Sequence, residues 1–551
     1  MKLRDYQHRC VDATIEAFND DRATLNVMPT GTGKTITFSE TIRRYCNGSR
    51  AMVIAHRDEL IRQAFQKIKA VTGIEPEIEM AEYRADQDEL GGKRVPVVVS
   101  SVQTQNAGRT PRMEKFDPFE FNLLIIDEAH HAPATSYRKV IDYYMANPSL
   151  RVLGVTATPD RADEAAMGQV FDSCSFDYGL IDAISDGWLV DIEQQYIHVE
   201  GLDFSEIRTT AGDLNQKDLA AVMAFEKVLH GSVIPTLELV GDRKCLLFAT
   251  TVAHAERMTE IINRYRNDSA FIIHASTPRN ERRELLRAYK QGRYQFMVNV
   301  GIATEGFDEP SIEVVVMCRP TKSRCLYAQM IGRGTRPLDE LVDYLNDCTE
   351  PASRRQIISG STKPNLLVID FAGNSGRHKL VSSADILGGD YDDDVVERAA
   401  RRVRENGAAT NMSQELRLAK DDLEAEEKRK RARVVAKAQW SSRNVNPFDV
   451  FSIKPQRERG WDKGRPPTAR MIQVLTRARV DKIDGISFAD AGRLISELKR
   501  RWSKDLCTYS QAKLLQKFEE NPECTMKEAS QKIDAIKDNG WRRLPQAPLS
   551  V

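Results

Sequence analysis

Short apolar runs alternate with longer helix-like stretches along the first part of the chain. Five runs are rich in Val, Ile and Leu and are too short for most helices: residues 23–28, 51–56, 95–101, 123–127 and 151–157. Runs of this length are typical of strands buried on both faces of a parallel sheet. The pattern predicts strands that alternate with helices, as in an α/β lobe.

The same pattern starts again further along the chain. A second set of apolar runs lies at residues 244–250, 270–275, 295–301, 312–318 and 365–371. We therefore expect an α/β chain with two similar parallel-sheet lobes, at residues 1–185 and 186–390. Residues 339–363 look like a loop or small insertion before the last strand.

The composition changes after residue 390. Residues 391–465 are charged and largely helix-like, which favours a helical linker, and residues 466–551 contain a weak internal repeat. Three positions recur 40 residues later: Thr468 as Thr508, Met471 as Gln511, and Leu475 as Leu515. The repeat predicts two small helical hairpins in a basic, mainly helical C-terminal region.

The net charge of zero hides an uneven distribution. Residues 398–551 contain 34 Lys and Arg against 21 Asp and Glu, a net charge of +13, so the preceding residues carry −13. A basic tail beside an acidic body predicts an appendage that binds a polyanion or a protein partner. The basic part contains Trp461, Trp502 and Trp541, for which we favour positions in a helical core over stacking on bases.

Composition narrows the class of protein. The chain has 551 residues, of which 41% are hydrophobic and 29% are charged. No apolar run reaches the roughly 18 residues that span a bilayer, and the first ten residues contain no apolar signal core. The nine cysteines form no CxxC pair, so we expect no zinc site. These features predict a cytoplasmic protein without a membrane partner.

A phosphate-binding loop follows the first predicted strand. Residues 26–35 read NVMPTGTGKT and fit the end of the pattern GxxxxGK[ST], with Met28 in place of the first glycine. Backbone N–H groups of such a loop surround a phosphate, and the next helix directs its positive end toward it. The pattern predicts an ATP site at Thr30, Gly31, Thr32, Gly33, Lys34 and Thr35, with Lys34 on the β/γ-phosphates and Thr35 on Mg²⁺.

Two carboxylates end the fourth apolar run. Residues 123–132 read LLIIDEAHHA, so Asp127 and Glu128 follow a strand that is expected to be buried. Buried charges are costly unless a partner compensates them. A magnesium ion held by Asp127 opposite Thr35 would be that partner. Glu128 would then orient and deprotonate the attacking water.

These motifs resemble those of superfamily 2 DEAD/DEAH-box helicases and translocases. The resemblance covers roughly residues 1–375 and includes LRDYQ (3–7), AHRDEL (55–60), SSVQT (100–104), DEAH (127–130), TATP (156–159), FATTVAHA (248–255), GIATEGFD (301–308) and QMIGRGTR (329–336). It implies two RecA-like lobes. Residues 298–336 most resemble RadD-like repair helicases and related phage and restriction-type motors, although the zinc-binding cysteines of RadD-like proteins are missing here.

The resemblance also implies roles for individual residues. Around the nucleotide it implies adenine recognition by Gln7 with Arg4, and a position for Asp308 near the nucleotide. It implies coupling between hydrolysis and strand binding through His130, Thr156 and Thr158. On the nucleic-acid side it implies contacts from Arg57, Ser101, Gln103, Thr104, Thr250 and Thr304.

The last of these motifs also has a physical explanation. Gln329, Arg333 and Arg336 recur at helical spacing, which predicts that they share one helix face. If the lobes close, the two arginines would face the phosphates and stabilise charge on the transferred phosphoryl group. A surface arginine pair on a solvated helix is the alternative.

The most economical hypothesis is an ATP- and Mg²⁺-dependent motor on nucleic acid, with DNA favoured over RNA. Backbone contacts would make it sequence-tolerant and sensitive to salt. Repair, replication and recombination are the processes that we favour. Three alternatives remain: the motor subunit of a restriction-type nuclease complex, an ATP-regulated clamp without turnover, and an RNA helicase.

Overall fold

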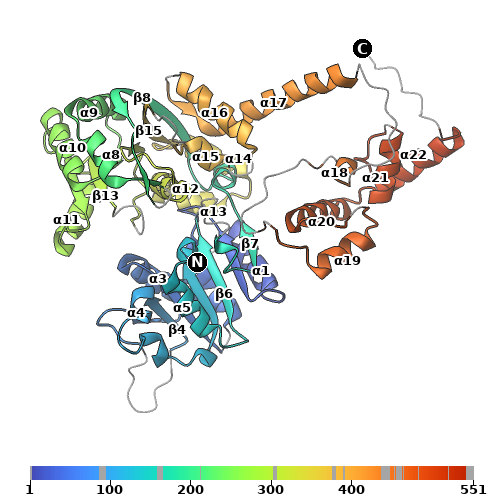
Figure 1. Ribbon diagram of the computed structural model, residues 1–551, viewed down its shortest axis with the longest axis horizontal. Coiled ribbons are helices and arrows are strands. Elements are labelled where there is room, and N and C mark those ends of the chain that lie inside the picture. The colour runs from blue at the N-terminus through green and yellow to red at the C-terminus, as the bar shows by residue number, and fades with distance from the viewer. Residues whose placement is uncertain are drawn as a thin grey trace. The chain divides into compact units, whose positions relative to one another are not determined.

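The computed structural model divides the chain into two compact units, Met1–Glu424 and Ala425–Val551. The structure describes residues 3–46, 48–85, 95–157, 166–210, 213–301, 307–374, 380–388, 391–406, 408–435, 447–451, 453, 462, 464–481, 483–518 and 520–541. Among these residues, no helix is long and apolar enough to cross a bilayer. The first unit contains two sheets with helices on both faces (Figure 1).

The first sheet has seven strands, all parallel, in the order β3-β4-β2-β5-β6-β1-β7. In chain order they are β1 (Ala23–Val27), β2 (Arg50–Ala55), β3 (Glu77–Glu79), β4 (Val97–Ser101), β5 (Phe121–Asp127), β6 (Arg151–Thr156) and β7 (Ser173–Asp177). Five of them coincide with the predicted apolar runs. The two edge strands, β3 and β7, were not predicted because they are only partly buried and carry polar residues.

Helices cover both faces of the first sheet. They are α1 (Asp5–Ala17), α2 (Lys34–Tyr45), α3 (Asp58–Thr72), α4 (Val102–Gln105) and α5 (Thr135–Tyr144), and α7 (Leu180–Ser185) follows the last strand of this sheet. Helices α2 and α3 pack against a layer that includes Val53, Val99 and Ile125. Helix α5 lies against β5 on the other face, where the ring of Tyr144 meets that of Phe121.

The second sheet also has seven strands, in the order β12-β13-β11-β14-β15-β8-β16. They are β8 (Asp191–Asp203), β11 (Cys245–Phe248), β12 (Ala270–His274), β13 (Phe296–Val300), β14 (Val314–Met317), β15 (Asn365–Asn374) and β16 (Thr410–Asn411); only β16 is antiparallel. A separate antiparallel ribbon is formed by β9 (Thr209–Thr210) and β10 (Asp213–Leu214). The fold class, two RecA-like lobes with a helical C-terminal region, is confirmed.

Strand β8 was missed because its sequence, DIEQQYIHVEGLD, is mostly polar. Its side chains alternate between buried and more exposed positions beside β15, so only half of them resemble core residues. Strands nearer the centre of the sheet, such as β14, are buried throughout and were predicted from their apolar runs.

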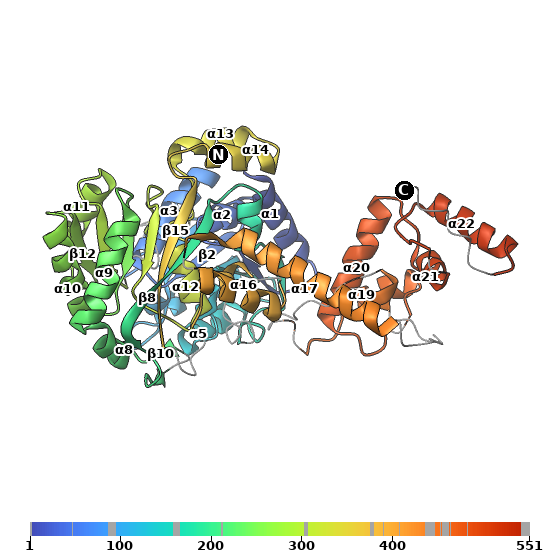
Figure 2. The same cartoon turned by 90° about the horizontal axis from the view of Figure 1, so that it is seen from above.

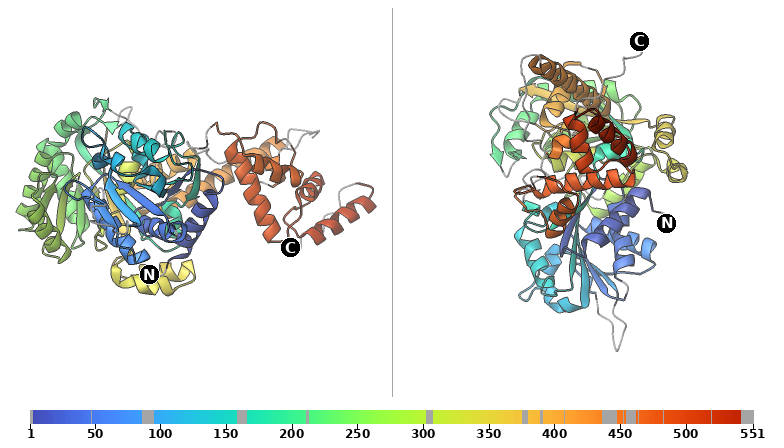
Figure 3. Two further views of the ribbon diagram at one scale, coloured as in Figure 1. Left: turned by 90° about the horizontal axis from the view of Figure 1, so that it is seen from below. Right: turned by 90° about the vertical axis from the view of Figure 1, so that its right-hand side faces the viewer.

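Alternate residues of the central strands face two different helix layers. Cys245 and Leu247 of β11 pack with α9 (Glu226–Val240) and α10 (Val252–Tyr265), and α8 (Gln216–Met223) adds Leu219 to this layer. Leu246 and Phe248 of β11 face the opposite cluster, to which α11 (Arg279–Lys290), α12 (Arg324–Ile331), α15 (Ser383–Leu387) and α16 (Asp393–Asn406) contribute. The helix layers are seen from above and below in Figures 2 and 3.

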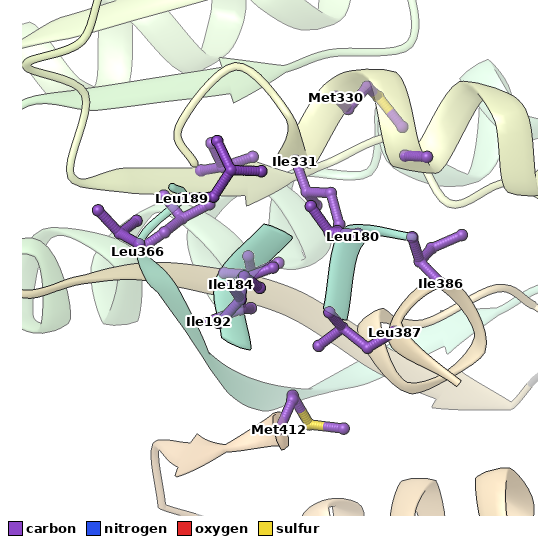
Figure 4. Packing of buried hydrophobic residues seen from close by; sticks show 14 of the residues in the cluster. Leu180, Ile184, Leu189, Ile192, Met330, Ile331, Leu366, Ile386, Leu387 and Met412 are labelled. Carbon is purple, nitrogen blue, oxygen red and sulfur yellow. The ribbon is translucent and has the colours of Figure 1, made fainter. Parts of the chain in front are cut away.

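The connector between the sheets belongs to the core of the second one. Leu180 and Ile184 of α7 lie with Ile192 of β8, Ile331 of α12 and Leu387 of α15 in one cluster (Figure 4). The cluster extends to Tyr6 and Met28 of the first lobe. The first lobe and the connector therefore share apolar contacts with the second lobe.

The expected linker at residues 391–465 begins too early. Helix α16 and the start of α17 (Met412–Val435) bury Val395, Val403, Met412 and Leu416 in the core of the second lobe, and β16 extends its sheet. The first unit accordingly runs to Glu424. The apolar residues of α16 follow a helical period among many charges, and the high charge had concealed this buried face.

The segment expected to be a loop or insertion at 339–363 contains two helices, α13 (Val342–Asp347) and α14 (Pro351–Ser359). Arg354 of α14 is buried; its guanidinium donates to the carbonyl oxygens of Asp186 (2.6 Å) and Cys348 (2.8 Å) and lies 4.2 Å from the ring centroid of Trp188. The insertion is therefore fixed to the connector between the lobes.

The second unit contains two helix pairs at the positions of the repeat. They are α19 (Ala469–Arg477) with α20 (Phe488–Ser503), and α21 (Tyr509–Lys517) with α22 (Met526–Asp538); the short α18 (Pro447–Val450) precedes them. Thr468 and Thr508 cap α19 and α21 through their hydroxyl oxygens, and Leu475 and Leu515 are fully buried. The recurring residues are thus a helix cap and a core residue.

Two tryptophans of this unit, Trp502 and Trp541, do not occupy core positions. Trp502 is 54% exposed and Trp541 is 52% exposed, so the expectation of core tryptophans is wrong for both. Trp461 lies outside the described residues. The core of the unit is instead built from smaller apolar residues, together with Tyr509 and the buried Arg501, whose guanidinium donates to Cys507 O (3.0 Å) and Pro522 O (2.6 Å).

We predict that Leu475→Ala destabilises the second unit by about 3 kcal/mol, because it leaves a cavity at a fully buried site. Hydrogen exchange should accelerate in α19 to α22, while amides of the central strands in the first unit keep their protection. Met526→Ala, at a residue that is 39% exposed, is the control, with an expected change below about 0.5 kcal/mol. Faster exchange throughout the chain would contradict the independence of the two units.

Candidate active site

Three neighbouring parallel strands of the first lobe bring the predicted motifs together. Strands β5, β6 and β1 are adjacent, with Asp127 paired to Val155 and Val27 paired to Thr156. All three end at the same edge of the sheet because they are parallel. The phosphate-loop sequence, the carboxylate pair and Thr156 therefore lie side by side at the carboxyl ends of the strands.

The loop between β1 and α2 has the backbone of a phosphate-binding loop. Gly31 and Gly33 have φ of 89° and 83°, a conformation that side chains other than glycine rarely adopt. Thr32 is buried and donates its hydroxyl to Pro29 O (2.7 Å), while Lys34 donates Nζ to Met28 O (3.4 Å). Helix α2 begins at Lys34, so its positive end opens at the loop.

Met28 replaces the first glycine of the loop pattern and serves as a packing residue. It is fully buried, and its Sδ lies 3.7 Å from Cys10 Sγ and 3.7 Å from Thr37 Oγ1. The start of the loop is therefore held by α1 and α2.

The residues expected to recognise adenine also support the loop from α1. Gln7 Nε2 donates to Thr32 O (3.0 Å), and Gln7 Oε1 accepts from Arg4 N (3.0 Å). Tyr6, which sequence reasoning did not single out, donates its hydroxyl to the same Thr32 O (2.6 Å) and stacks on Tyr178 at 4.7 Å. Both polar ends of Gln7 are thus bonded to the protein.

Arg4 connects the first lobe to the second. Its Nε donates to Asn346 Oδ1 of α13 (3.2 Å), and its guanidinium lies 4.4 Å from the ring centroid of Trp188. Trp188 is therefore contacted by Arg4 of one lobe and by Arg354 of the other.

Asp127 and Glu128 form a buried carboxylate pair. They are 5% and 6% exposed, and Glu128 has a φ of 50°, which is unusual for a residue other than glycine. Burial, and then the neighbouring Glu128, raise the pKa of Asp127 well above its usual range. Glu128 Oε2 has no hydrogen-bond partner among the described residues, although His130 Nδ1 lies 3.5 Å away.

This donor set fits a magnesium ion. A divalent cation would relieve the repulsion that raises the pKa of Asp127, and carboxylate and hydroxyl oxygens are suitable magnesium ligands. No group of three or more His, Cys, Asp or Glu side chains in the described part of the chain could hold a metal. Magnesium needs no such group, because it keeps waters and binds substrate phosphates.

His130 links the carboxylate pair to the neighbouring strand. Its Nδ1 lies 3.1 Å from the hydroxyl of Thr156, at the end of β6, and Thr156 O accepts from Met28 N (2.9 Å). Thr156 is fully buried and so connects His130 with the start of the phosphate loop. Thr158, the other predicted coupling residue, lies outside the described residues.

The three residues of the last motif do not share one helix face. Helix α12 ends at Ile331, with Gly332 as its cap, so only Gln329 is helical and Arg333 and Arg336 follow the helix. Two glycines, Gly332 and Gly334, flank Arg333 and interrupt the helical period here. The chain turns toward the first lobe instead of continuing the helix.

This turn brings the second lobe into contact with the phosphate loop. A methyl group added to Gly332 would lie 2.7 Å from Thr30 Cβ, and one added to Gly31 would lie 2.8 Å from Arg336 Cγ. Both distances are shorter than normal contacts between carbon atoms. The two lobes therefore meet at glycines, and Arg336 lies against the phosphate loop rather than on a solvated helix.

Nearby groups hold the two arginines, whereas the amide of Gln329 keeps an unpaired donor among the described residues. Arg336 forms ion pairs with Asp308 and with Asp339 (3.1 Å), and Arg333 Nη1 donates to Phe307 O (2.6 Å). Gln329 is buried, and its Nε2 has no hydrogen-bond partner among the described residues. Asp308, predicted near the nucleotide, thus holds the arginine that contacts the loop.

Among the residues predicted to contact nucleic acid, Ser101 and Thr104 are buried. Ser101 caps α4 by accepting from Thr104 N (3.1 Å) and donates its hydroxyl to Thr104 Oγ1 (2.7 Å). Gln103 is exposed and donates to His56 O (3.2 Å). Of the three residues Ser101, Gln103 and Thr104, only Gln103 is therefore exposed at the surface.

The other predicted contacts are more varied. Arg57 Nη1 donates to Gly301 O of the second lobe (3.3 Å). Thr250 is buried and bonded to His254 Nδ1 (2.9 Å), whose pKa burial lowers to about 4. Thr304 lies outside the described residues. His131 packs its ring 4.6 Å from that of His56, next to Arg57.

Two family models match the lobes. Residues 1–161 match the family described as type III restriction enzyme, res subunit, and residues 229–337 match the helicase conserved C-terminal domain. The predicted resemblance to superfamily 2 helicases is confirmed by this pair of domains, in this order. The C-terminal unit is matched by neither model.

Similar proteins include helicases and restriction enzymes. The chain is 31% identical to "Putative ATP-dependent helicase IRC3" of Saccharomyces cerevisiae, over 61% of this chain and 49% of that protein. It is 26% identical to the type I restriction enzyme EcoAI endonuclease subunit of Escherichia coli, over 61% and 44% respectively. The chain thus spans about half the length of these relatives.

A solved structure shares the fold of the chain. The ATP-dependent type ISP restriction-modification enzyme LlaBIII, bound to DNA, superposes with a TM-score of 0.53 at 16% identity and covers 98% of this chain and 40% of that enzyme.

We predict that Glu128→Gln stabilises the nucleotide-free protein at pH 8 by about 1 kcal/mol, because it removes one of two buried like charges. The folded-state pKa of Asp127 lies above its unfolded value, so the folded state binds more protons and stability falls as pH rises from about 4 to the raised pKa. The variant should show a weaker fall over this window in denaturant titrations.

Glu114→Gln is the matched control for this experiment, because Glu114 is exposed in the same lobe. It should leave both the free energy of unfolding and its pH dependence unchanged. A loss of stability in Glu128→Gln at pH 8 would contradict the repulsion between the two carboxylates.

Proposed function

We propose that the protein is an ATP-hydrolysing motor that moves along or remodels DNA. The observation that carries this proposal is the contact of Gly332 and Arg336 of the second lobe with Thr30 and Gly31 of the phosphate loop. A nucleotide held by this loop would touch both lobes, so its hydrolysis would change their contact. Confirmed helicase domains in both lobes support the proposal.

The first lobe would bind the nucleotide and the metal. Backbone N–H groups from Thr30 to Thr35 would surround the phosphates, and Lys34 would leave Met28 O to reach the β/γ-phosphates. Thr35 and Asp127 would hold Mg²⁺, which neutralises charge on the phosphates when bound. Arg4 and Gln7 lie at the start of α1 beside the loop, where they would form the adenine side of the site.

The carboxylate of Glu128 would act as the base. Its Oε2 is buried and has no hydrogen bond to a described residue, so it is free to orient a water and take its proton. Arg336 would exchange its ion pair with Asp308 for the phosphates, and Arg333 and Gln329 would support it. Such arginines accelerate hydrolysis by a factor of about 10³–10⁵ in related NTPases.

The hydrogen bond between His130 and Thr156 would couple the site to the nucleic-acid surface. It joins the segment that carries Glu128 to the end of β6, and from there to the phosphate loop. Arg57 and Gln103 lie near each other through His56 and would contact the strand backbone. Contacts of this kind are independent of base sequence and sensitive to salt.

DNA is the favoured track. LlaBIII, which shares the fold, is described as bound to DNA, and the EcoAI relative is a subunit of a DNA restriction enzyme class. The same two proteins favour a second candidate function, the motor of a restriction-type complex, in which another subunit would cut. An ATP-regulated clamp would keep the site but would not hydrolyse ATP, and an RNA helicase would respond to RNA alone.

The experiment is a measurement of ATP hydrolysis by the purified chain without nucleic acid and with single-stranded DNA, duplex DNA, forked DNA or RNA. We expect strong stimulation by at least one DNA form. Lys34→Ala should reduce hydrolysis to background under every condition, because the phosphates lose their lysine. Arg287→Ala, at an exposed arginine of α11, is the control and should retain the full rate.

Each result separates the candidate functions. Stimulation by duplex but not single strands favours translocation on duplex DNA, as in restriction motors. Stimulation by RNA alone replaces the DNA motor with an RNA helicase. Tight nucleic-acid binding with no hydrolysis under any condition overturns the motor in favour of the clamp.

We predict that Thr156→Val and His130→Ala each lower the DNA-stimulated rate about fivefold to tenfold, the equivalent of one hydrogen bond, with a smaller effect on the unstimulated rate. The double variant should be no worse than either single variant, because both remove the same interaction. Thr24→Val, which removes a buried hydroxyl of β1 bonded to Ser173, is the control. Additive losses would show that the two residues act separately.

A further inference from the structure

A cavity lies where the two helix pairs of the C-terminal unit meet. The end of α19, the end of α20 and the start of α21 line a volume of 670 Å³. Both copies of the repeat contribute, so one helical hairpin alone would not form the cavity. Its volume lies in the range of small-ligand pockets.

The cavity has an apolar floor. Leu498 of α20 and Tyr509 of α21 are 2% and 1% exposed, and Val474 of α19 adds to this surface. The hydroxyl of Tyr509 lies 3.4 Å from Asp481 Oδ2, so its polar end is already bonded within the protein. The floor therefore favours a flat apolar group over a strongly hydrated one.

Trp502 stands at the rim, 54% exposed. An indole that is half exposed to water loses the stabilisation that full burial would give. An exposed ring beside a cavity can instead stack on an aromatic ligand. The adjacent Arg501 is buried and bonded to Cys507 O and Pro522 O, which fixes the end of α20. The indole is thus presented from a fixed helix end.

The remaining rim is positively charged. Arg477 and Arg479 line the cavity and are exposed, and neither forms an ion pair with a described residue. Arg479 has a φ of 57°, a conformation that costs an arginine roughly 1 kcal/mol and a glycine little. Among the described residues, no acidic side chain lines the cavity, and the nearby Asp481 forms an ion pair with Lys513.

The charge of the two repeat copies differs in the same sense. Residues 466–505 contain nine Lys and Arg against five Asp and Glu, whereas residues 506–541 contain five against six. The excess of positive charge therefore belongs to the helix pair that carries both arginines and Trp502. A ligand with an aromatic ring and flanking negative charges matches this surface.

We propose that this cavity binds single-stranded nucleic acid, with one unstacked base between Trp502 and the apolar floor and its flanking phosphates on Arg477 and Arg479. A paired base in a duplex is stacked on both sides and could not enter the cavity. Stacking on an aromatic side chain and pairing of phosphates with arginines are the usual elements of single-strand binding. The site is separate from the ATP site and does not depend on hydrolysis.

The test uses the full chain and a labelled oligonucleotide of about 12 nucleotides, within the size of known single-strand sites. Trp502→Ala should raise Kd about tenfold, the loss expected for one stacked base. Trp502→Phe keeps an aromatic ring and should recover most of the affinity. Trp541→Ala, at a tryptophan that is 52% exposed and does not line the cavity, should change Kd less than about twofold.

The arginines are tested through salt dependence. Arg477→Ala with Arg479→Ala should lower the slope of log K against log salt by about 1.4, the contribution of two phosphate contacts to a single strand. Lys527→Ala with Lys537→Ala removes the same charge from exposed positions of α22 outside the cavity. An equal change of slope in both pairs would overturn the proposal, because it would indicate general attraction to the basic unit.

Hydrogen exchange locates the site. Amides in residues 474–510 should gain protection with single-stranded DNA or RNA oligonucleotides and not with a duplex of the same length. The DNA and RNA arms identify the kind of strand that the cavity prefers. Absence of protection with both the single-stranded DNA and the single-stranded RNA, or equal protection with the duplex, would overturn the proposal. ATP hydrolysis without nucleic acid should be the same in all these variants, which separates this test from that of the motor.

Discussion

Two adjacent carboxylates can remain buried only if something compensates their charge. Asp127 and Glu128 are placed in this position by β5, whose apolar residues fix the strand in the centre of the first sheet. Burial, and then the repulsion between them, raise the pKa of Asp127, and the groups around them supply only partial compensation. The neighbouring elements follow from this constraint: Thr35 and Lys34 are set on α2, and His130 and Thr156 beside the pair. The site is organised to receive positive charge.

The second lobe contacts this site where glycines leave room for side chains of the other lobe. Gly31 and Gly332 leave just enough space for Arg336 and Thr30, so the backbones of the two lobes approach closely. A close approach makes the contact sensitive to small shifts, because packed surfaces give way abruptly rather than gradually. The ion pair of Arg336 with Asp308 keeps the arginine at the edge of the loop. The geometry thus joins nucleotide binding to the relative position of the lobes.

The sequence predicted the parts of the fold that depend on continuous apolar runs. The central strands of both sheets were found, since burial on both faces requires such runs. Strand β8 and the buried face of helix α16 were not, because their buried residues alternate with polar ones or are surrounded by charges. The helical spacing of Gln329, Arg333 and Arg336 was misleading, because Gly332 ends α12. Long-range partners such as Tyr6 with Thr32, or Trp502 beside the repeat cavity, leave no local pattern that could predict them.

Trp188 has a consequence for the motion of the lobes. It lies in the connector, with Arg4 of the first lobe at 4.4 Å and Arg354 of the inserted helices at 4.2 Å from its ring. Such contacts are worth about 0.5–2 kcal/mol each and resist salt better than exposed ion pairs do. The two contacts tie the first lobe and the inserted helices of the second lobe to one side chain of the connector. A change in the relative position of the lobes therefore has to break one of these contacts or move all three side chains together.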